Sequence, residues 1–430
     1  MSDYVSLTDK EREEMLSALG VSSVSELFAD VPRELGRLKV HLSQGRTQKE
    51  TEELVSSFAA RNKVYKSVFL GAGSYRHYIP AAVSAIVSRE EFLTAYTPYQ
   101  PEISQGILQA MFEYQTMMCS LTGMDVSNAS HYSGATAAAE ACLMCLGKTG
   151  RIAVYDNVNP DTLETVATYA RARGAQVDVI PTSGGRAVPY EGEADAVYLE
   201  SPNYYGLLED VTAVADTAHF AGGKVVVGCN PVSLALFRTP AELGADIAVG
   251  DGQPLGLPMS FGGPSFGFIT AKKEFTRKLP GRIVGETKDA EGRRAFVLTL
   301  QAREQHIRRE KASSNICSNQ AHAALTASVY LSLMGSAGLR AVAETCASNA
   351  HYLAGKLAEA GAPLVYRGEF FHEFVTDVKG KAAEIVCALD REDILGGLVL
   401  SPDRILWCCT ETVGKADMDK VAETVGRVLK

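Results

Sequence analysis

From about residue 150 onward, short apolar runs alternate with amphipathic segments. The apolar runs are residues 152–155, 177–180, 196–200, 224–229, 246–250 and 266–270. Between them, residues 161–173 and 209–221 have the apolar spacing of helices that cover a sheet. Strands that alternate with helices need crossover connections, which give a mostly parallel sheet covered on both faces. The pattern therefore predicts an α/β domain whose ligand lies at the carboxyl ends of the strands.

The remaining segments follow other patterns. Residues 1–60 alternate short helical patterns with polar breaks and predict an N-terminal helical extension that wraps a larger body. We expect the large α/β domain to span 61–330. Residues 331–430 read as helices and antiparallel strands, one of them at 363–368, and predict a smaller C-terminal α+β domain. An apolar helical stretch closed by Gly335 begins the segment 319–358, which we expect to bridge the two domains.

Composition narrows the possible functions. The chain has 430 residues, 46% of them hydrophobic and 22% charged, as in ordinary multidomain globular proteins. A net charge of −9 argues against a nucleic-acid-binding protein, which normally presents a basic face. The chain contains neither a long apolar run nor a signal-peptide pattern, so we expect a cytoplasmic protein that does not bind membranes.

The cysteines give no metal motif. Nine scattered cysteines in a large acidic chain are typical of reduced core thiols rather than of disulfides. Cys142 and Cys145 form a C-x-x-C pair inside an apolar helical segment, without a second pair or a nearby histidine. Packing is therefore favoured over zinc binding or redox work, and we expect no metal site.

Three loops are candidates for chemistry. Residues 133–136 precede an apolar helix, so the free N–H groups there could hold a phosphate, and an ordinary serine or threonine cap fits equally well. Residues 95–106 place Tyr96, Tyr99 and Gln100 around two prolines, as in a pocket wall or a domain seam. Residues 250–267 are rich in glycine directly after a strand, which permits close approach of a ligand or another chain.

A fourth candidate is the polar run 280–317. A solvated helix would explain its charged part, from Arg303 to Lys311, without any ligand. The run leads, however, into consecutive polar residues and then into the apolar helix at 319–333. A helix start preceded by hydroxyls and arginines is typical of an anion site. The polar residues are Ser313, Ser314 and Asn315.

Taken in order, eight motifs carry a resemblance to a known family. They are FLGAGSYRHYIP, YTPYQPEISQG, EYQT, NASHYSGATAAAEA, GQPLGLPMSFGGP, PGRIVGET, REQHIRREKASSNIC and ILGG. The chain resembles the glycine decarboxylase P-protein of the glycine cleavage system, and within it the α subunit of the form that is split into two polypeptides. The resemblance implies the fold-type I architecture of pyridoxal-phosphate enzymes.

Two positions depart from the cofactor-bearing half of that family. There a lysine in the strand-end loop forms the Schiff base, and the equivalent position, counted back from the glycines at 262–263, is Gln253. An amide nitrogen does not form an imine, because its lone pair is delocalised. Asn230 stands where the acid facing the pyridine nitrogen is expected, although asparagine before Pro231 is also a normal turn residue. We expect no covalent pyridoxal phosphate and no catalytic residue in this chain.

The resemblance also implies partners. A lysine-bearing β subunit, in a heterodimer or an α2β2 assembly, would carry the pyridoxal phosphate. The complex would decarboxylate glycine and pass the aminomethyl group to the lipoyl group of H-protein. Residues expected at the partner's site are Tyr96, Tyr99 and Gln100 as lining, Ser313, Ser314 and Asn315 as phosphate contacts, and Arg308 or Arg309 as positive charge or interface ion pairs.

Other interpretations remain open. A free-standing pyridoxal enzyme would use Lys272 or Lys273, although their setting favours the exposed start of a helix. A noncatalytic regulatory or scaffolding homologue would bind the partner without contributing to turnover. Arg76 and Ser133, like Asn230, depart from the family pattern in loops that face the pocket, as drift in a vacant site or as a divergent paralogue would produce. Histidine is the side chain best suited to proton transfer near neutral pH, but the sequence assigns His77 and His306 no role.

Overall fold

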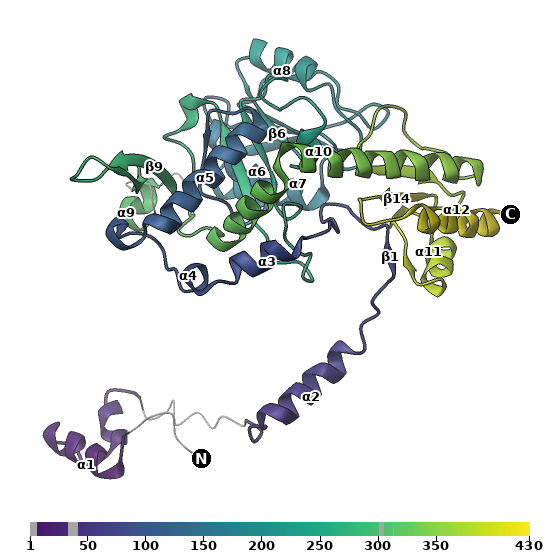
Figure 1. Cartoon of the computed structure of the whole chain (residues 1–430). Coiled ribbons are helices and arrows are strands. Elements are labelled where there is room, and N and C mark those ends of the chain that lie inside the picture. The colour runs from purple at the N-terminus through teal and green to yellow at the C-terminus, as the bar shows by residue number, and fades with distance from the viewer. Residues whose placement is uncertain (1–6, 33–41, 301–304, 313) are drawn as a thin grey trace. The chain divides into compact units, whose positions relative to one another are not determined.

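The computed structural model describes residues 7–32, 42–300, 305–312 and 314–430, which fall into two compact units, Met1–Val64 and Tyr65–Lys430 (Figure 1). The first unit contains helices α1 (Asp9–Ala18) and α2 (Gln48–Ala59). Each begins with a capping box, in which a threonine hydroxyl and a glutamate carboxylate exchange hydrogen bonds with backbone N–H groups. Such caps matter because helices of this length are marginal in water by themselves.

The second unit consists of a large sheet with covering helices, followed by a smaller sheet with its own helices. Its elements are β1 (Ser67–Val68), α3 (Ala81–Val87), α4 (Glu90–Leu93), α5 (Gln105–Thr122), β2 (Val126–Ser127), α6 (Gly134–Cys145), β3 (Arg151–Tyr155), α7 (Pro160–Ala172), β4 (Gln176–Ile180), β5 (Ala196–Glu200), α8 (Val211–Phe220), β6 (Lys224–Gly228), β7 (Ile247–Asp251), β8 (Gly267–Ala271), β9 (Ile283–Lys288), β10 (Arg294–Thr299), α9 (Gln305–Arg308), α10 (Ala321–Glu359), β11 (Glu373–Asp377), α11 (Ala382–Arg391), β12 (Ile394–Leu395), β13 (Leu398–Ser401), β14 (Arg404–Cys408) and α12 (Lys415–Leu429).

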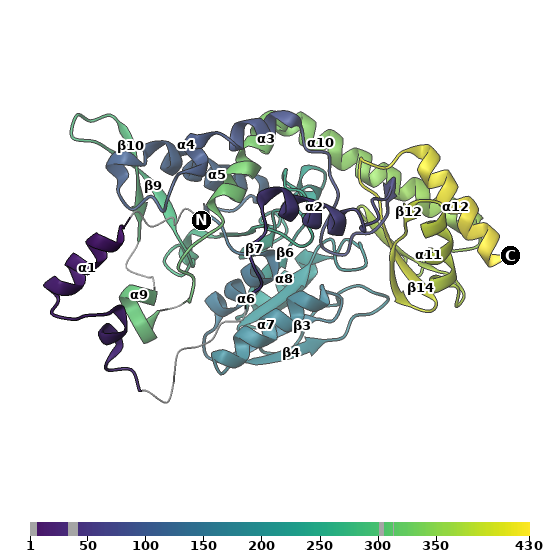
Figure 2. The same ribbon diagram turned by 90° about the horizontal axis from the view of Figure 1, so that it is seen from below.

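The large sheet has seven strands in the order β2-β8-β7-β6-β5-β3-β4. Neighbouring strands from β4 to β7 are parallel, and β8 runs antiparallel to both β7 and β2. The predicted mostly parallel sheet is confirmed, since the six apolar runs coincide with β3 to β8. Helices α6, α7 and α8 pack against the sheet and share its main apolar core (Figure 2).

The smaller sheet, β11-β14-β13, is antiparallel and packs around the buried Trp407, together with α11, α12 and the end of α10. Helix α10 runs from the large sheet toward these strands (Figure 1). It is interrupted at Gly335, where φ is 58° and ψ is −177°, as the sequence predicted. Within the described residues, no helix is long and apolar enough to cross a lipid bilayer.

Two expectations differ from the structure. The strand predicted at 363–368 is wrong, because Leu364 makes only an isolated bridge with Thr376. Pro363 has no N–H to donate, and Gly368 leaves the extended conformation with a φ of 137°. Conversely, the hairpin of β9 and β10 lies inside the polar run 280–317 and was not predicted. Strand β9 is buried only at its first two residues and ends in exposed polar ones, so it lacks the alternation by which a strand is recognised.

Candidate functional site

A cavity of about 380 Å³ lies where the parallel strands end, the position that the α/β pattern predicts for a ligand. Its wall combines the ends of β5, β6 and β7 with the first turn of α6. The segment 71–75 and Glu373 of β11 complete the wall, so the large and the small sheet both contribute. The cavity therefore depends on the packing of two sheets that are far apart in sequence.

Gln253 is fixed beside this cavity by its own amide group. Its Oε1 accepts a hydrogen bond from the Tyr75 N–H at 2.8 Å, and its Nε2 donates to the carbonyl oxygens of Tyr75 and Leu257, both at 2.8 Å. The residue is only 4% exposed. The amide thus joins the loop after β7 to the segment 71–75. A protonated lysine amine could not replace it, because it cannot accept a hydrogen bond from the Tyr75 N–H.

Asn230 has a local structural role. Its Oδ1 accepts from the Val232 N–H at 2.9 Å, and its carbonyl oxygen accepts from the Ser233 hydroxyl at 2.7 Å. Its Nδ2 lies 3.4 Å from Nε2 of the buried His372. These contacts form the turn after β6 that an asparagine before a proline favours.

Two buried carboxyl groups dominate the cavity, and the sequence reasoning missed both. Glu200 accepts from the Tyr198 hydroxyl at 3.0 Å and from the Asn159 N–H at 2.8 Å. Glu373 accepts from the Tyr75 hydroxyl at 2.7 Å and from a backbone N–H. Burial raises the pKa of each carboxyl group to about 7, and Glu200 adds to the effect on Glu373. Glu200 closes a predicted strand, so the strand-end rule could have identified it.

A third carboxylate occupies the start of α6. Asp251 Oδ2 accepts from the Gly134 N–H at 3.0 Å, while its Oδ1 accepts from the Gln253 N–H and the Ser265 hydroxyl. A Cβ at Gly134 would lie 2.7 Å from the Asp251 nitrogen, so glycine permits this approach. Ser133 caps the helix by accepting from the Thr136 N–H at 3.3 Å. The protein's own groups thus use N–H groups that could have held a phosphate.

These residues do not fit pyridoxal phosphate. The cavity wall, all of it in the described part of the chain, contains no lysine, arginine or histidine. It lacks an amine for the aldehyde and an acid at position 230 for the pyridine nitrogen. A phosphate at the start of α6 would meet Asp251, and three further carboxyl groups, those of Asp161, Glu200 and Glu373, line the same space. We therefore assign this cavity no reaction step through that cofactor.

The residues predicted to reach a partner lie outside the cavity. Tyr96 is 85% exposed and Tyr99 is 43% exposed, and both belong to the segment between α4 and α5, as does the exposed Gln100. None of the three contributes to the cavity wall. The structure brings them together on one surface segment, apart from Gln253.

The buried Arg282 holds this exposed segment in place through Tyr99. Its side chain is buried, with 5% of the residue exposed, and Nη2 donates to the Tyr99 hydroxyl at 2.9 Å. The guanidinium carbon also lies 5.2 Å from the centre of the Tyr99 ring, and Nη1 donates to Asn319 Oδ1 at 3.3 Å. The sequence reasoning missed Arg282, because only the fold brings it to Tyr99.

The predicted anion site is not at a helix start. Helix α10 begins at Ala321, several residues after Ser314 and Asn315, and Ser313 lies outside the described residues. The Ser314 hydroxyl donates to Glu140 Oε1 at 2.7 Å and accepts from the Ile316 N–H at 3.1 Å. Asn315 is exposed. Burial raises the pKa of Glu140 to about 7.

The charged residues before this segment are exposed. Arg308 ends α9, and Arg309 begins the short 3-10 helix η7 (Arg309–Lys311). His306 also lies on α9 and is exposed. None of these three residues contributes to the cavity wall.

The two lysines considered as alternatives, Lys272 and Lys273, lie at the end of the large sheet opposite the cavity, where β7 begins. Because β8 is antiparallel to β7, its last residue, Ala271, pairs with Ile247, the first residue of β7. Asp251 ends β7, about 13 Å from Ile247 at the usual rise per residue. Lys272 forms an ion pair with Asp246 at 2.8 Å, and Lys273 begins the 3-10 helix η5 (Lys273–Phe275). Neither lysine reaches the cavity.

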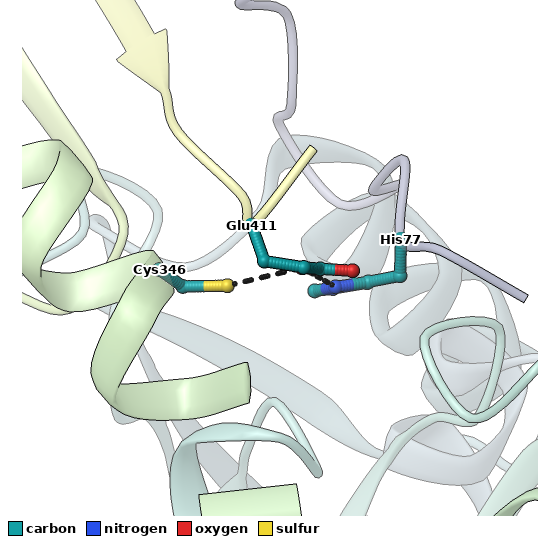
Figure 3. Close-up of side chains that lie close together, drawn as sticks. All are labelled: His77, Cys346 and Glu411. Atoms are coloured by element: carbon teal, nitrogen blue, oxygen red, sulfur yellow. Dashed lines mark hydrogen bonds and ion pairs between the residues drawn. The ribbon is translucent and has the colours of Figure 1, made fainter. Parts of the chain in front are cut away.

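A second cluster of reactive groups lies elsewhere in the unit. Figure 3 shows His77, Cys346 and Glu411 with their side chains directed toward one another. His77 Nδ1 lies 2.8 Å from Glu411 Oε2, and Cys346 Sγ donates to the same oxygen at 3.3 Å. The segment containing His77 is also held by the Thr410 hydroxyl, which donates to the Arg76 carbonyl oxygen at 2.6 Å.

The sequence matches one family over nearly its whole length. A family model described as the glycine cleavage system P-protein matches residues 2–425. Proteins named "Probable glycine dehydrogenase (decarboxylating) subunit 1" from Desulfitobacterium hafniense and Moorella thermoacetica are 44% and 45% identical to this chain. The alignments cover 99% of this chain in both cases, and 100% and 99% of those relatives.

Solved structures give the same relationship. A crystal structure of glycine decarboxylase (P-protein) of the glycine cleavage system, in inhibitor-bound form, is 42% identical, with a TM-score of 0.93, and the match covers 99% of this chain and 100% of that one. Sphingosine-1-phosphate lyase of Burkholderia pseudomallei shares only the fold, at 14% identity and a TM-score of 0.65, with 93% and 94% of the two chains covered. The architecture is therefore fold type I, as the motifs implied.

Proposed function

Because the chain belongs to the glycine cleavage system P-protein family, we propose that it is the α subunit of a glycine dehydrogenase (decarboxylating) built from two kinds of subunit. With a lysine-bearing β subunit it decarboxylates glycine and transfers the aminomethyl group to the lipoyl group of H-protein. The main support is the full-length match to relatives named subunit 1, in a chain whose Gln253 replaces the expected lysine.

The cofactor belongs to the β subunit in this proposal. Pyridoxal phosphate, bound there, supplies the electron sink that decarboxylation requires. Four carboxyl groups line the α-subunit cavity, and the residue beside it, Gln253, carries an amide nitrogen that is not nucleophilic. Its residues support the fold by joining the strand ends to the segment 71–75.

The exposed segment between α4 and α5 is the proposed contribution to the partner's site. Tyr96, Tyr99 and Gln100 are available at the surface, and aromatic side chains with few rotamers are efficient contact residues. Arg282 holds the Tyr99 ring through its hydroxyl, so this tyrosine can meet a partner with little loss of conformational freedom.

The segment around residue 315 is the proposed neighbour of the partner's phosphate. A phosphate needs hydrogen-bond donors, and the exposed Asn315 has an amide N–H₂ group that can donate. The Ser314 proton is already donated to Glu140, so Ser314 can serve a phosphate only if this contact changes. Arg308 supplies positive charge from the exposed end of α9.

Separate and joint preparation of the two subunits tests the proposal. The measurement is glycine-dependent exchange of labelled carbon dioxide in the presence of lipoylated H-protein. We expect activity only when this chain and the β subunit are combined. Borohydride treatment should leave a pyridoxyl adduct on the β subunit and none on this chain. Exchange activity or an adduct in this chain alone would overturn the proposal.

A further inference from the structure

Three segments of the fold meet at His77, Cys346 and Glu411. His77 belongs to the segment between β1 and α3, Cys346 to α10, and Glu411 to the segment after β14 (Figure 3). One potential ligand atom from each residue lies within 4.8 Å of the others. The sequence separates the first two residues by more than half of the chain, so only tertiary packing creates the cluster.

The cluster contains polar groups that the described protein atoms leave unsatisfied. The His77 side chain is 2% exposed, and its Nε2 has no hydrogen-bond partner among the described residues. The only ion-pair partner of Glu411 in that part of the chain is His77. The hydroxyl of the buried Tyr330 also lacks a partner there, and Glu411 and Cys346 both act on it electrostatically. Buried polar groups without partners are uncommon, so these atoms mark an unusually polar pocket in the fold. The ligand atom of His77 in this pocket is Nδ1, which faces Glu411.

We propose that His77, Cys346 and Glu411 form a binding site for a divalent transition-metal ion, with Zn²⁺ as the best-matched ion. A thiolate, an imidazole and a carboxylate are common zinc ligands, and three of them leave a fourth position for water. Tetrahedral zinc separates its ligand atoms by about 3.3–3.6 Å. The distance between Cys346 Sγ and Glu411 Oε2, 3.3 Å, already lies in this range, and that between His77 Nδ1 and Glu411 Oε2, 2.8 Å, must lengthen by about half an ångström.

Charge and proton balance are consistent with this ion. Binding releases the Cys346 thiol proton to solvent. His77 binds as the neutral imidazole through Nδ1, with its one proton on Nε2. The resulting thiolate and the Glu411 carboxylate together neutralise a dication. The Tyr78 N–H donates to Glu411 Oε1 at 2.6 Å, which leaves Oε2 directed at the other two side chains. That outer contact orients the carboxylate, as in known metal centres.

The site would act on the architecture rather than on the reaction, and the inference does not rest on the proposed function. A bound ion would link the segment before α3 to α10 and to the small sheet. The same segment carries Tyr75, which binds both Gln253 and Glu373. Metal binding would therefore restrain the segment that contains both Tyr75 and His77, and through Tyr75 it would stabilise the cavity wall.

Cobalt substitution tests the site on the full-length chain. The chain is stripped with a chelator and titrated with Co²⁺, whose thiolate charge-transfer and d–d absorption bands report a sulfur ligand and a tetrahedral geometry. We expect one Co²⁺ per chain, displaced by Zn²⁺, and a higher melting temperature with either ion. Cys346→Ser should abolish the charge-transfer band and weaken binding at least about tenfold.

Matched variants make the outcome decisive. Cys317→Ser and Cys387→Ser remove the two exposed cysteines and should leave the band and the affinity unchanged. If Cys346→Ser fails to fold, Glu411→Gln decides, because it keeps the side-chain size and an acceptor for the Tyr78 N–H. Unchanged affinity in Glu411→Gln, a band that persists in Cys346→Ser, or no stoichiometric uptake by the unmodified chain would each overturn the proposal.

Discussion

The cavity at the strand ends and the exposed segment that carries Tyr99 use polar residues in opposite ways. In and beside the cavity, Glu200, Asp251 and Gln253 form hydrogen bonds within the chain. In the exposed segment, Tyr96 and Gln100 remain at the surface. A group that is fully hydrogen-bonded internally contributes to stability, whereas an exposed one contributes to recognition. We therefore expect cavity substitutions to change the stability of this chain and surface substitutions to change the activity of the complex.

The largest effect is expected for Gln253→Leu. Leucine would leave the Tyr75 N–H and two carbonyl oxygens without their partner, which should lower the free energy of unfolding by roughly 3–5 kcal/mol. Denaturant unfolding of the isolated chain measures this loss, and Gln109→Leu on the exposed face of α5 is the control. Equal stability of both variants would contradict the structural role of Gln253.

Glu200→Gln should change the pH dependence of stability. Burial raises the pKa of Glu200 from its ordinary 4.5 to about 7. Between these values the folded chain holds a proton that the unfolded chain has released, so the stability from this group falls as pH rises and is constant above that window. Between about pH 5 and about pH 8, the variant should gain roughly 2–3 kcal/mol relative to the unmodified chain.

Melting curves at the two pH values check this prediction. Glu113→Gln, on the exposed face of α5, controls for the loss of one carboxylate at the surface. A difference between Glu200→Gln and the unmodified chain that does not change with pH would show that Glu200 is ionised in the folded protein throughout.

Tyr99→Ala tests the surface side of the comparison. Truncation of an anchored aromatic residue at an interface should reduce glycine-dependent exchange by the assembled complex at least about tenfold. The unfolding curve of the isolated chain should barely change. Phe220→Ala, an exposed aromatic residue on α8, is the control for truncation elsewhere. Full activity of Tyr99→Ala complexes would remove this residue from the partner's site.

Arg282→Lys should have the smallest effect, because the residue acts on the partner's site only through its contact with Tyr99. Lysine keeps the charge but loses the fork that reaches Tyr99 and Asn319, so we expect about a threefold loss of exchange activity. Tyr99→Phe removes the other side of the same hydrogen bond. The double variant should be no worse than the more affected single variant. Additive losses would indicate that the two residues act separately.

The sequence predicted the large sheet well and the contacts less completely. Each apolar run from 152 to 270 became a strand. The inner strands are buried on both faces and leave a continuous apolar signal, whereas the edge strand β4 is only partly buried and has fewer apolar residues. The hairpin of β9 and β10 escaped prediction because β9 is buried only at its first two residues and then continues into exposed polar ones. The strand expected at 363–368 failed at Pro363 and Gly368, where hydrogen bonding and backbone conformation oppose a ladder.

For the site, the motifs indicated that Gln253 and Asn230 replace cofactor-binding residues, but not what these residues do instead. The amide contacts of Gln253 depend on the segment 71–75, which the chain brings near only through tertiary packing. The same limit applies to Arg282 beneath Tyr99 and to Glu373 from the small sheet. The sequence also gave no sign of the His77 cluster, because its members share no local spacing.

The two ends of helix α10 pack into different apolar cores, and the change from one core to the other occurs after Cys346, well past the bend at Gly335. Residues from Ala323 to Cys346 pack into one apolar cluster with α5 and the loops of the large sheet, and those from Ala350 to Leu357 pack into the cluster around Trp407. A chain cut at the bend would expose apolar surface on both fragments. Neither half is therefore expected to survive as a separately expressed module, and the two sheets should melt in a single transition.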